Sequence, residues 1–360
     1  MLNSTVILQA SQDAEWDSFL SAHPAGHYTQ SSLWGQLKAR FGWQVIRILI
    51  KDTDQIVGGA QILTRHLPIW GHIGYISKGP VVHPDHPQVI QLILDEISTL
   101  ARREAIFLVS IQPPVDTQTY LDILIKNSYK VSSYYVIPPC TVVIDLTQSE
   151  DELLSHMKRT TRQNIRAAQA RGVIIKEGSS ADLPAFCQLK QMTESRSEFV
   201  HYDQCYYEEA WHQLAPGGNM KLWLAYFEEE LLAGLMAIYF GQWVVYAWAG
   251  STRLYPEKRP NDLLFWHAML WGKEQGYHYC DLGGISPIVA DALLQDREPP
   301  DCKEKGIARY KLGFGPMHTF PPAYDNIFLL KPKWMVRKAI AFAWGKDRKF
   351  VSQLIRGVKR

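Results

Sequence analysis

The chain has 360 residues, a formal net charge of +2 and a hydrophobic fraction of 46%, a length typical of about two domains. This composition excludes a disordered or fibrous protein. The five cysteines are widely spaced and form no C-x-x-C pair. They therefore indicate neither a disulfide framework nor a zinc ribbon, and they favour a reducing cytoplasm. The first ten residues lack the basic and apolar regions of a signal peptide.

The first half of the chain predicts strands, a helix and a further strand. Residues 56–63 form an apolar strand pattern, residues 88–103 have helical periodicity, and residues 105–111 form an apolar strand. His83 and His86 lie in the Pro-rich stretch before the helix. We expect a turn there and no metal site.

One long helix is predicted across residues 149–172, with a capping box at its start and a glycine at its end. Its second half carries only positive charges, and Lys158, Arg162 and Arg166 recur on one face. Like charges at that spacing destabilise a helix. Either buried carboxylates or a phosphate-bearing ligand should therefore lie against this face.

An uncharged apolar run, residues 231–250, has a length that could span a membrane. Gly241-Gln242 lies at its centre, so we interpret the run as two buried strands joined by a tight turn. A helix pattern at 261–275 and a strand pattern at 277–282 follow. This order repeats that of the first half.

Two residue pairs support a duplication, because Gly58 and Gly234 are separated by the same number of residues as Pro84 and Pro260. Each copy would contain three strands, a helix and a strand. That unit resembles the core of GNAT-type acyltransferases. The fold class we predict is α+β, with tandem GNAT-like acyltransferase domains, each a mixed sheet flanked by helices.

Two domains and a tail are expected. The first domain covers residues 1–147, the second 148–319, and residues 320–360 form a basic amphipathic tail. Residues 331–360 contain ten Lys or Arg and one acidic residue, interleaved with large apolar residues. This pattern is typical of a segment that binds an anionic membrane or RNA. The alternative is a structural helix that packs back on the first domain.

Seven motifs run through most of the chain. They are Gln30-Ser31-Ser32-Leu33-Trp34 with Lys38; Met157-Lys158-Arg159 through Asn164-Ile165-Arg166 and Ala168 to Gly172-Val173; Thr193 with Arg196 and Phe199; Tyr246 to Ser251; Asn261 to Trp266; Cys280 to Ile285; and Gly306 to Gly315. Together they resemble the Fem-type (FemABX) aminoacyltransferases. The helical arm of some members has no room between Phe199 and Lys221, so the chain is similar to the shorter members.

The resemblance implies transfer of an amino acid from aminoacyl-tRNA to the stem peptide of a UDP-linked or lipid-linked peptidoglycan precursor. It implies no metal and no organic cofactor, and a cytoplasmic protein, peripheral at the inner membrane face if residues 331–360 bind anionic lipid. It also implies that Lys311 meets the terminal adenosine of tRNA or the developing oxyanion. Lys38 would hold a diphosphate of the precursor.

Asp281 follows a predicted strand, where it would either orient and deprotonate the acceptor amine or hold the glycine turn that comes next. The remaining candidates for substrate binding are Trp34, Arg162, Arg166, Arg196, Tyr246, Ser251 and Tyr310, the last at a position where the family often has Phe.

The chain has neither a G-x-S-x-G elbow nor a Cys-His nucleophile motif, so direct attack by the acceptor amine is expected. Residues 258–263 stand where acetyl-CoA enzymes have a glycine-rich pyrophosphate loop, but they contain no glycine and include Asp262. This disfavours acyl-CoA as donor. Two alternatives stay open: an N-acyltransferase that uses acyl-CoA or another donor on a cell-wall, lipid or small amine acceptor, and a non-catalytic protein that binds precursor or RNA.

Overall fold

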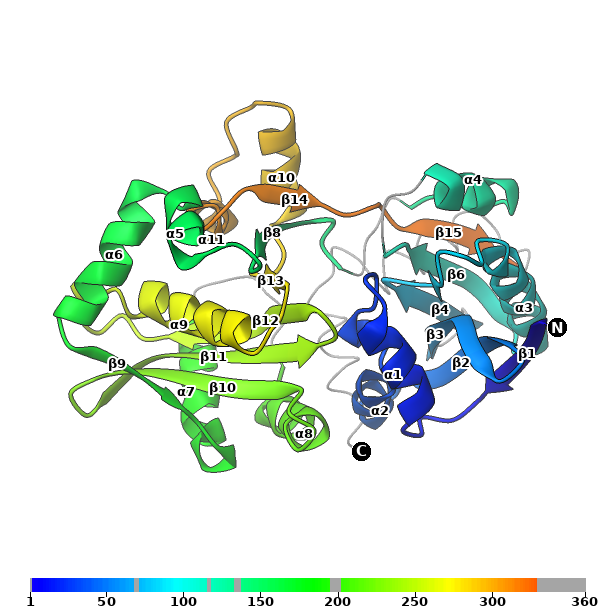
Figure 1. The fold of residues 1–360 in the computed structure, drawn as a ribbon, viewed down its shortest axis with the longest axis horizontal. Coiled ribbons are helices and arrows are strands. Elements are labelled where there is room, and N and C mark those ends of the chain that lie inside the picture. The colour runs from blue at the N-terminus through cyan, green and yellow to red at the C-terminus, as the bar shows by residue number, and fades with distance from the viewer. Residues whose placement is uncertain (1, 68–70, 115–117, 133–136, 195–201, 329–360) are drawn as a thin grey trace. The chain divides into compact units, whose positions relative to one another are not determined.

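The computed structural model describes residues 2–67, 71–114, 118–132, 137–194 and 202–328. It divides the chain into two compact units (Figure 1). Unit 1 comprises Met1–Ile137 and Phe320–Arg360, and unit 2 comprises Pro138–Thr319. The division precedes the predicted boundary at residue 147, because the strand at Cys140–Asp145 pairs within the sheet of unit 2. The predicted tail, residues 320–360, is described only as far as residue 328, and its strand Tyr324–Ile327 pairs within the sheet of unit 1. The basic part of the tail, residues 331–360, lies outside the described residues.

Unit 1 is a mixed sheet in the order β1-β2-β3-β4-β6-β15-β7, with β5 paired to β3. Its elements are β1 (Leu2–Ile7), α1 (Ala14–Ala22), η1 (Tyr28–Gln30), α2 (Ser32–Arg40), β2 (Gln44–Asp52), β3 (Gln55–Leu67), β4 (Gly71–Ser77), β5 (Val81–Val82), α3 (Val89–Arg103), β6 (Ile106–Gln112), α4 (Gln118–Lys126), β7 (Lys130–Val131) and β15 (Tyr324–Ile327).

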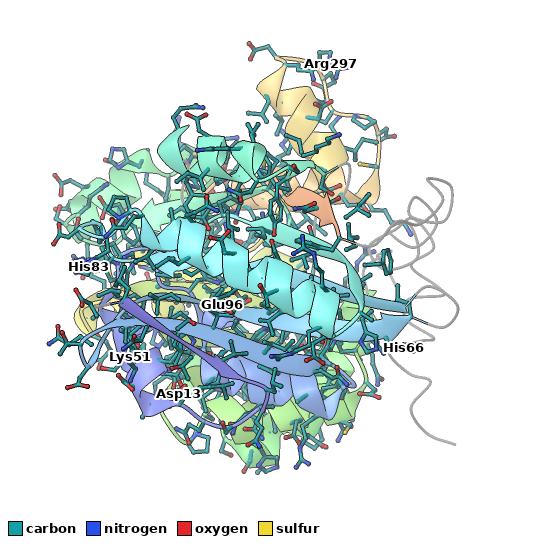
Figure 2. All side chains as sticks on the ribbon, turned by 90° about the vertical axis from the view of Figure 1, so that its right-hand side faces the viewer. Asp13, Lys51, His66, His83, Glu96 and Arg297 are labelled. Atoms are coloured by element: carbon teal, nitrogen blue, oxygen red, sulfur yellow. The ribbon has the colours of Figure 1, made fainter. Side chains whose placement is uncertain are left out.

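Helices cover both faces of the unit 1 sheet. A Cβ added to Gly58 would meet Val89 of α3, and one added to the next residue, Gly59, would meet Trp16 of α1. Because successive strand residues point to opposite faces, α3 and α1 lie on opposite sides of β3. Figure 2 labels Glu96 on α3, where its carboxylate accepts a hydrogen bond of 2.7 Å from Ser4 of β1. The apolar side of α3 and the sheet form the core of this unit.

Unit 2 is a sheet in the order β14-β8-β13-β12-β11-β10-β9. Its elements are β8 (Cys140–Asp145), α5 (Glu150–His156), α6 (Arg159–Ala170), β9 (Val173–Glu177), η2 (Ser180–Asp182), α7 (Leu183–Glu194), α8 (Gln204–Leu214), β10 (Met220–Phe227), β11 (Glu230–Phe240), β12 (Trp243–Ser251), η3 (Pro256–Lys258), α9 (Pro260–Glu274), β13 (Tyr279–Asp281), α10 (Pro287–Leu294), α11 (Lys303–Lys311) and β14 (Met317–Thr319).

The tandem GNAT-like fold class is confirmed. In each unit three antiparallel strands lead to a helix and then to a strand that is parallel to the third. The predicted hairpin is also confirmed, since Gly241 adopts a φ of +56° and Phe240 pairs with Trp243. Among the described residues, no helix combines the length and apolarity that crossing a bilayer requires.

The two spacing matches that indicated the duplication are not equivalent positions. Gly58 faces α3, whereas a Cβ on Gly234 would meet Phe186 of α7, which packs on the face of its sheet opposite α9. Pro260 is the first residue of α9, whereas α3 begins at Val89, five positions after Pro84. The evidence for the duplication is therefore the repeated order of elements and not these residue pairs.

The prediction of one helix across residues 149–172 is wrong, because the chain forms α5 and α6 with a break between them. Met157 has an extended backbone with a ψ of 151°, and the N–H of Lys158 donates to the carbonyl of Gly313 at 2.8 Å. The capping box of Ser149 and Glu152 is present at the start of α5. A contact distant in sequence therefore ends a helix whose local pattern continues.

Candidate active site

The candidate site of unit 2 lies where the parallel strands β12 and β13 stop pairing. Their register runs from Trp243–Tyr279 to Val245–Asp281 and then ends. In unit 1 the corresponding strands stay paired to their last residues, Ser77 and Gln112. Beyond Val245, the side of β12 that faced β13 has no strand partner among the described residues.

A turn directly after β13 forms one wall of this opening. Gly283 adopts a φ of +81°, which favours glycine. Oδ1 of Asp281, a residue 9% exposed, accepts a hydrogen bond from the Gly283 N–H at 2.7 Å and another from the hydroxyl of Thr141 on β8. These hydrogen bonds match the structural role considered for Asp281, which is to hold the glycine turn.

Lys311, the last residue of α11, lies against the same turn. Its Nζ donates to the carbonyls of Gly283 at 2.8 Å and Gly284 at 3.0 Å. Burial lowers the pKa of Lys311 to about 8, and the charge of Asp281 opposes that shift. An ammonium has three donors, so the two carbonyls leave one N–H for another acceptor. The arrangement can donate a charge-assisted hydrogen bond near neutral pH.

Two tyrosines among the candidate residues pack in the core beside Lys311. Tyr246 donates from its hydroxyl to the carbonyl of Phe265 at 2.5 Å. The ring of Tyr310 lies 5.5 Å from the rings of Phe265 and Phe314, measured between centroids. Burial raises the pKa of both tyrosines well above the usual value. Both hydroxyls therefore stay neutral and contribute to packing around the lysine.

Ser251 lies at the end of β12, away from the three residues through which β12 pairs with β13. The backbone N–H of Ser251 donates to Thr193 Oγ1 at 2.9 Å, which ties the end of β12 to α7. Arg196 falls outside the described residues.

The two arginine candidates on α6 have different surroundings. Nη1 of Arg162 donates to the carbonyls of Leu154, Ser155 and Met157 at 3.1, 3.2 and 2.7 Å, so it closes the carboxyl end of α5. We expected a carboxylate or a phosphate to compensate the positive charge of Arg162. The structure shows these helix carbonyls in that place. Arg166, one turn further along, is exposed.

Trp34 and Lys38 lie on α2 of unit 1. The Lys38 Nζ is 5.3 Å from the centroid of the Trp34 ring, and burial together with the charge of Arg65 lowers the pKa of Lys38 to about 8. Trp34 also packs edge-on against Tyr28 at 4.9 Å. This cluster is therefore cationic and aromatic.

The amino terminus of α9 offers few donors to an anion. Arg259 has a φ of +55°, and the first helical residue is Pro260, which lacks an N–H. Asp262 is buried, accepts a hydrogen bond of 3.2 Å from Asn164, and has its pKa raised by burial. A pyrophosphate at this helix end would meet a carboxyl group and fewer N–H groups than in a glycine-rich loop.

Thr141 was not predicted as a site residue, and no local sequence signal marks it. Its contact with Asp281 spans 140 residues. Within the part of the chain that the structure describes, no group of three or more His, Cys, Asp or Glu side chains is placed to hold a metal ion.

Two family models match the chain in succession. The FemAB family model matches residues 11–132, and the acetyltransferase (GNAT) domain model matches residues 155–318. The lipid II:glycine glycyltransferase of Staphylococcus saprophyticus is 28% identical over 229 residues, which are 61% of this chain and 55% of that protein. The enzyme of the same name from Staphylococcus aureus is 28% identical over 221 residues, 58% of this chain and 52% of that protein. The chain thus spans about half the length of the curated relatives it matches.

Solved structures share the fold over most of the chain. A crystal structure of FemX superposes with a TM-score of 0.81 at 20% identity, and the match covers 94% of this chain and 99% of FemX. A tandem GNAT protein from the clavulanic acid biosynthesis pathway superposes with a TM-score of 0.52 at 11% identity over 92% of this chain and all of that one. The two family matches and the glycyltransferase relatives show that the chain is similar to the Fem-type (FemABX) family, and the superpositions show that it has the tandem GNAT-like fold.

Proposed function

We propose that this protein is an aminoacyltransferase that moves an amino acid from aminoacyl-tRNA to the stem peptide of a peptidoglycan precursor. The observation that carries the proposal is the position of Lys311, whose ammonium is held by two carbonyls beside the unpaired side of β12. The printed names of the staphylococcal relatives, lipid II:glycine glycyltransferase, support a lipid-linked precursor as acceptor and an amino acid as the group transferred.

The reaction needs positioning and charge stabilisation more than it needs a covalent intermediate. The acceptor amine attacks the ester carbonyl of the aminoacyl-tRNA, and a carbon–nitrogen bond forms. The carbonyl oxygen becomes an oxyanion, to which the remaining N–H of Lys311 donates. The ester carbon–oxygen bond then breaks, and the ribose hydroxyl leaves with the proton that the amine gives up.

The buried Asp281 is assigned a supporting role in this scheme. Its Oδ1 already accepts two hydrogen bonds, and its negative charge lies near the Lys311 ammonium. We therefore assign Asp281 to holding the turn and keeping Lys311 protonated, and we leave proton removal from the amine to the leaving hydroxyl or solvent.

The cationic and aromatic cluster on α2 is proposed to bind the acceptor. An ammonium in partly desolvated surroundings binds a diphosphate more strongly than one in water, and Lys38 is buried enough for its pKa to fall to about 8. Trp34 is only 8% exposed, so we assign it to holding Lys38 beside its ring. Contact with an anionic membrane through residues 331–360 remains part of this proposal.

The exposed cations of α6 are proposed to meet RNA phosphates. Lys158, Arg159 and Arg166 are exposed, and within the described residues none of them pairs with a carboxylate. Phosphate contacts of this kind supply sequence-independent affinity that weakens as salt rises. Arg162 is not included, because its guanidinium is engaged by helix carbonyls.

Transfer of radiolabelled Gly, Ala or Ser from charged tRNA to purified UDP-linked and lipid-linked precursors tests the proposal. We expect transfer by the wild type and a loss of about 10²-fold or more in Lys311→Ala, the scale seen when an oxyanion donor is removed. Lys303→Ala, exposed on the same helix, is the matched control and should keep its activity. Absence of transfer with every pair, together with saturable coenzyme A binding, would replace the proposal by an acyl-CoA-dependent transferase.

A further inference from the structure

We propose that Thr141 is the positioning residue of the Lys311 ammonium, and that it acts through Asp281 and the Gly283–Gly284 turn. The inference depends on the proposed function only for the role of Lys311 in aminoacyl transfer. The chain of contacts that supports it belongs to unit 2 alone, and its effect on Lys311 can be measured without any substrate.

The first step is the fixed direction of the Thr141 hydroxyl. Thr141 is 2% exposed on β8, and its strand neighbours Cys140 and Val142 belong to the apolar core. By the alternation of a strand, Thr141 projects from the opposite side. Its β-branched side chain has few rotamers, and its hydroxyl donates to Oδ1 of Asp281. A valine would fill the same space and could not donate.

The second step is the link from Asp281 to the turn. The same Oδ1 that accepts from Thr141 also accepts from the N–H of Gly283. This oxygen joins β8 to the turn together with two backbone hydrogen bonds, from the Leu282 N–H to the Val142 carbonyl at 3.0 Å and from the Ile285 N–H to the Cys140 carbonyl at 2.8 Å. The turn is also packed tightly, because a Cβ on Gly284 would lie 2.4 Å from Cγ of Pro138. Without the threonine hydroxyl, the carboxylate keeps only its bond to the turn and can rotate.

The third step is the link from the turn to the ammonium. The carbonyls of Gly283 and Gly284 point at the Lys311 Nζ from 2.8 and 3.0 Å. Burial destabilises the charged form of Lys311. Among the described residues, these two carbonyls and the charge of Asp281 stabilise it. Loss of the carbonyl contacts therefore lowers the pKa of Lys311 further and lets the side chain adopt other rotamers.

Other titratable groups lie on the elements around this site. They are Arg309 on α11, His318 on β14 opposite Thr141, Cys280 on β13, and the buried Tyr246 and Tyr310. Burial raises the pKa of Cys280, Tyr246 and Tyr310, so these three stay neutral. The exposed His318 is removed in a control variant.

The experiment measures the ionisation of Lys311 directly in the full chain. The pH dependence of acetylation by acetic anhydride, followed by mass spectrometry of the Lys311 peptide, gives the midpoint. We expect Thr141→Val to lower the midpoint by about one pKa unit, equivalent to about 1.4 kcal/mol. Thr141→Ser keeps the hydroxyl and should restore the wild-type midpoint. Thr319→Val, exposed on the neighbouring β14, and His318→Gln should leave it unchanged.

An unchanged midpoint in folded Thr141→Val would overturn the proposal, as would equal shifts in Thr141→Val and Thr141→Ser. If Thr141→Val does not fold, Thr141→Ala, which introduces no clash, is measured in its place and decides by the same criteria. The labelling uses neither tRNA nor precursor. A shift in a protein that transfers nothing would therefore uphold the positioning role while refuting the proposed function.

With active protein, the pH profile gives a second readout. The alkaline limb of kcat should move to lower pH in Thr141→Val and return in Thr141→Ser, while KM for the acceptor stays the same. A purely structural role for Thr141 would lower the amount of folded enzyme and leave the position of that limb unchanged.

Discussion

Replacing Arg162 with alanine should separate a structural arginine from an RNA-binding one on the same helix. The last carbonyls of an α-helix have no partner within the helix. At the end of α5 the carbonyls of Leu154, Ser155 and Met157 accept from the Arg162 Nη1. Alanine removes this donor, and it also removes the positive charge that stabilises the negative end of the α5 dipole.

The magnitude follows from these contacts. Nη1 carries two hydrogens, so the three distances of 3.1, 3.2 and 2.7 Å represent at most two well-formed hydrogen bonds. A charge-assisted hydrogen bond contributes about 1.5–3 kcal/mol when shielded, and partial exposure of Arg162 reduces this. We expect a loss of about 2 kcal/mol in the free energy of unfolding of unit 2. For a unit of this size that corresponds to a Tm lower by about 4–8 °C.

Urea and thermal unfolding of the full chain measure this loss, with Arg166→Ala as the matched control. Arg166 is exposed one helical turn away, so its replacement should change stability by less than about 0.5 kcal/mol. It should instead weaken tRNA binding and lower the salt dependence of that binding by about one unit of slope. Equal Tm changes in the two variants, or an unchanged Tm in Arg162→Ala, would refute the capping role.

Two further predictions concern the turn and its lysine. Gly283→Ala should lower the rate of transfer much more than the stability of the fold. A Cβ at this position would lie 3.2 Å from both the Lys311 Nζ and the Tyr246 carbonyl, whereas the left-handed backbone costs only about 1–2 kcal/mol of stability. Parallel losses in kcat and Tm would contradict this. The pKa of Lys311 is about 8 in the folded chain and about 10.5 when unfolded, so between these pH values the unfolded chain holds more protons. The stability of the wild type relative to Lys311→Met should therefore rise from pH 8 to 10.5, as urea unfolding at three pH values will show, and a difference that stays flat or falls would exclude this titration.

The elements that sequence predicts well are those whose signals are local. Gly241 marks the turn of the β11–β12 hairpin because its φ of +56° favours glycine. The amphipathic pattern of α3 is equally local. Element order alone then predicts the duplicated unit.

The break between α5 and α6 could not be predicted in this way. Residues 149–172 satisfy a helix pattern throughout, but the Lys158 N–H bonds to the carbonyl of Gly313. The interruption depends on a residue far along the chain. Arg162 caps the carboxyl end of α5, and this end exists only because the helix is interrupted. The capping role of Arg162 was therefore equally unpredictable from the local sequence.

The candidate site was partly predictable, and its supporting residue was not. The family resemblance suggested Lys311, and the glycine pair after a predicted strand suggested Asp281 as candidates. Thr141 is one threonine among the apolar residues of a strand. Its contact depends on β8 pairing antiparallel with β13, and the register of strands so far apart is set by the whole unit.

The position of β15 between β6 and β7 determines when each unit can be completed during synthesis. Unit 2 is one continuous stretch and can fold as soon as it leaves the ribosome. In unit 1, β7 pairs with β15 alone among the described strands, and the nearby hydrogen bond from Ser132 to Asp325 spans 193 residues. At about 5–20 residues per second, β7 waits roughly 10–40 s for its partner. The amino-terminal unit is thus the last to close, and until then β6 presents an unpaired edge to other nascent chains.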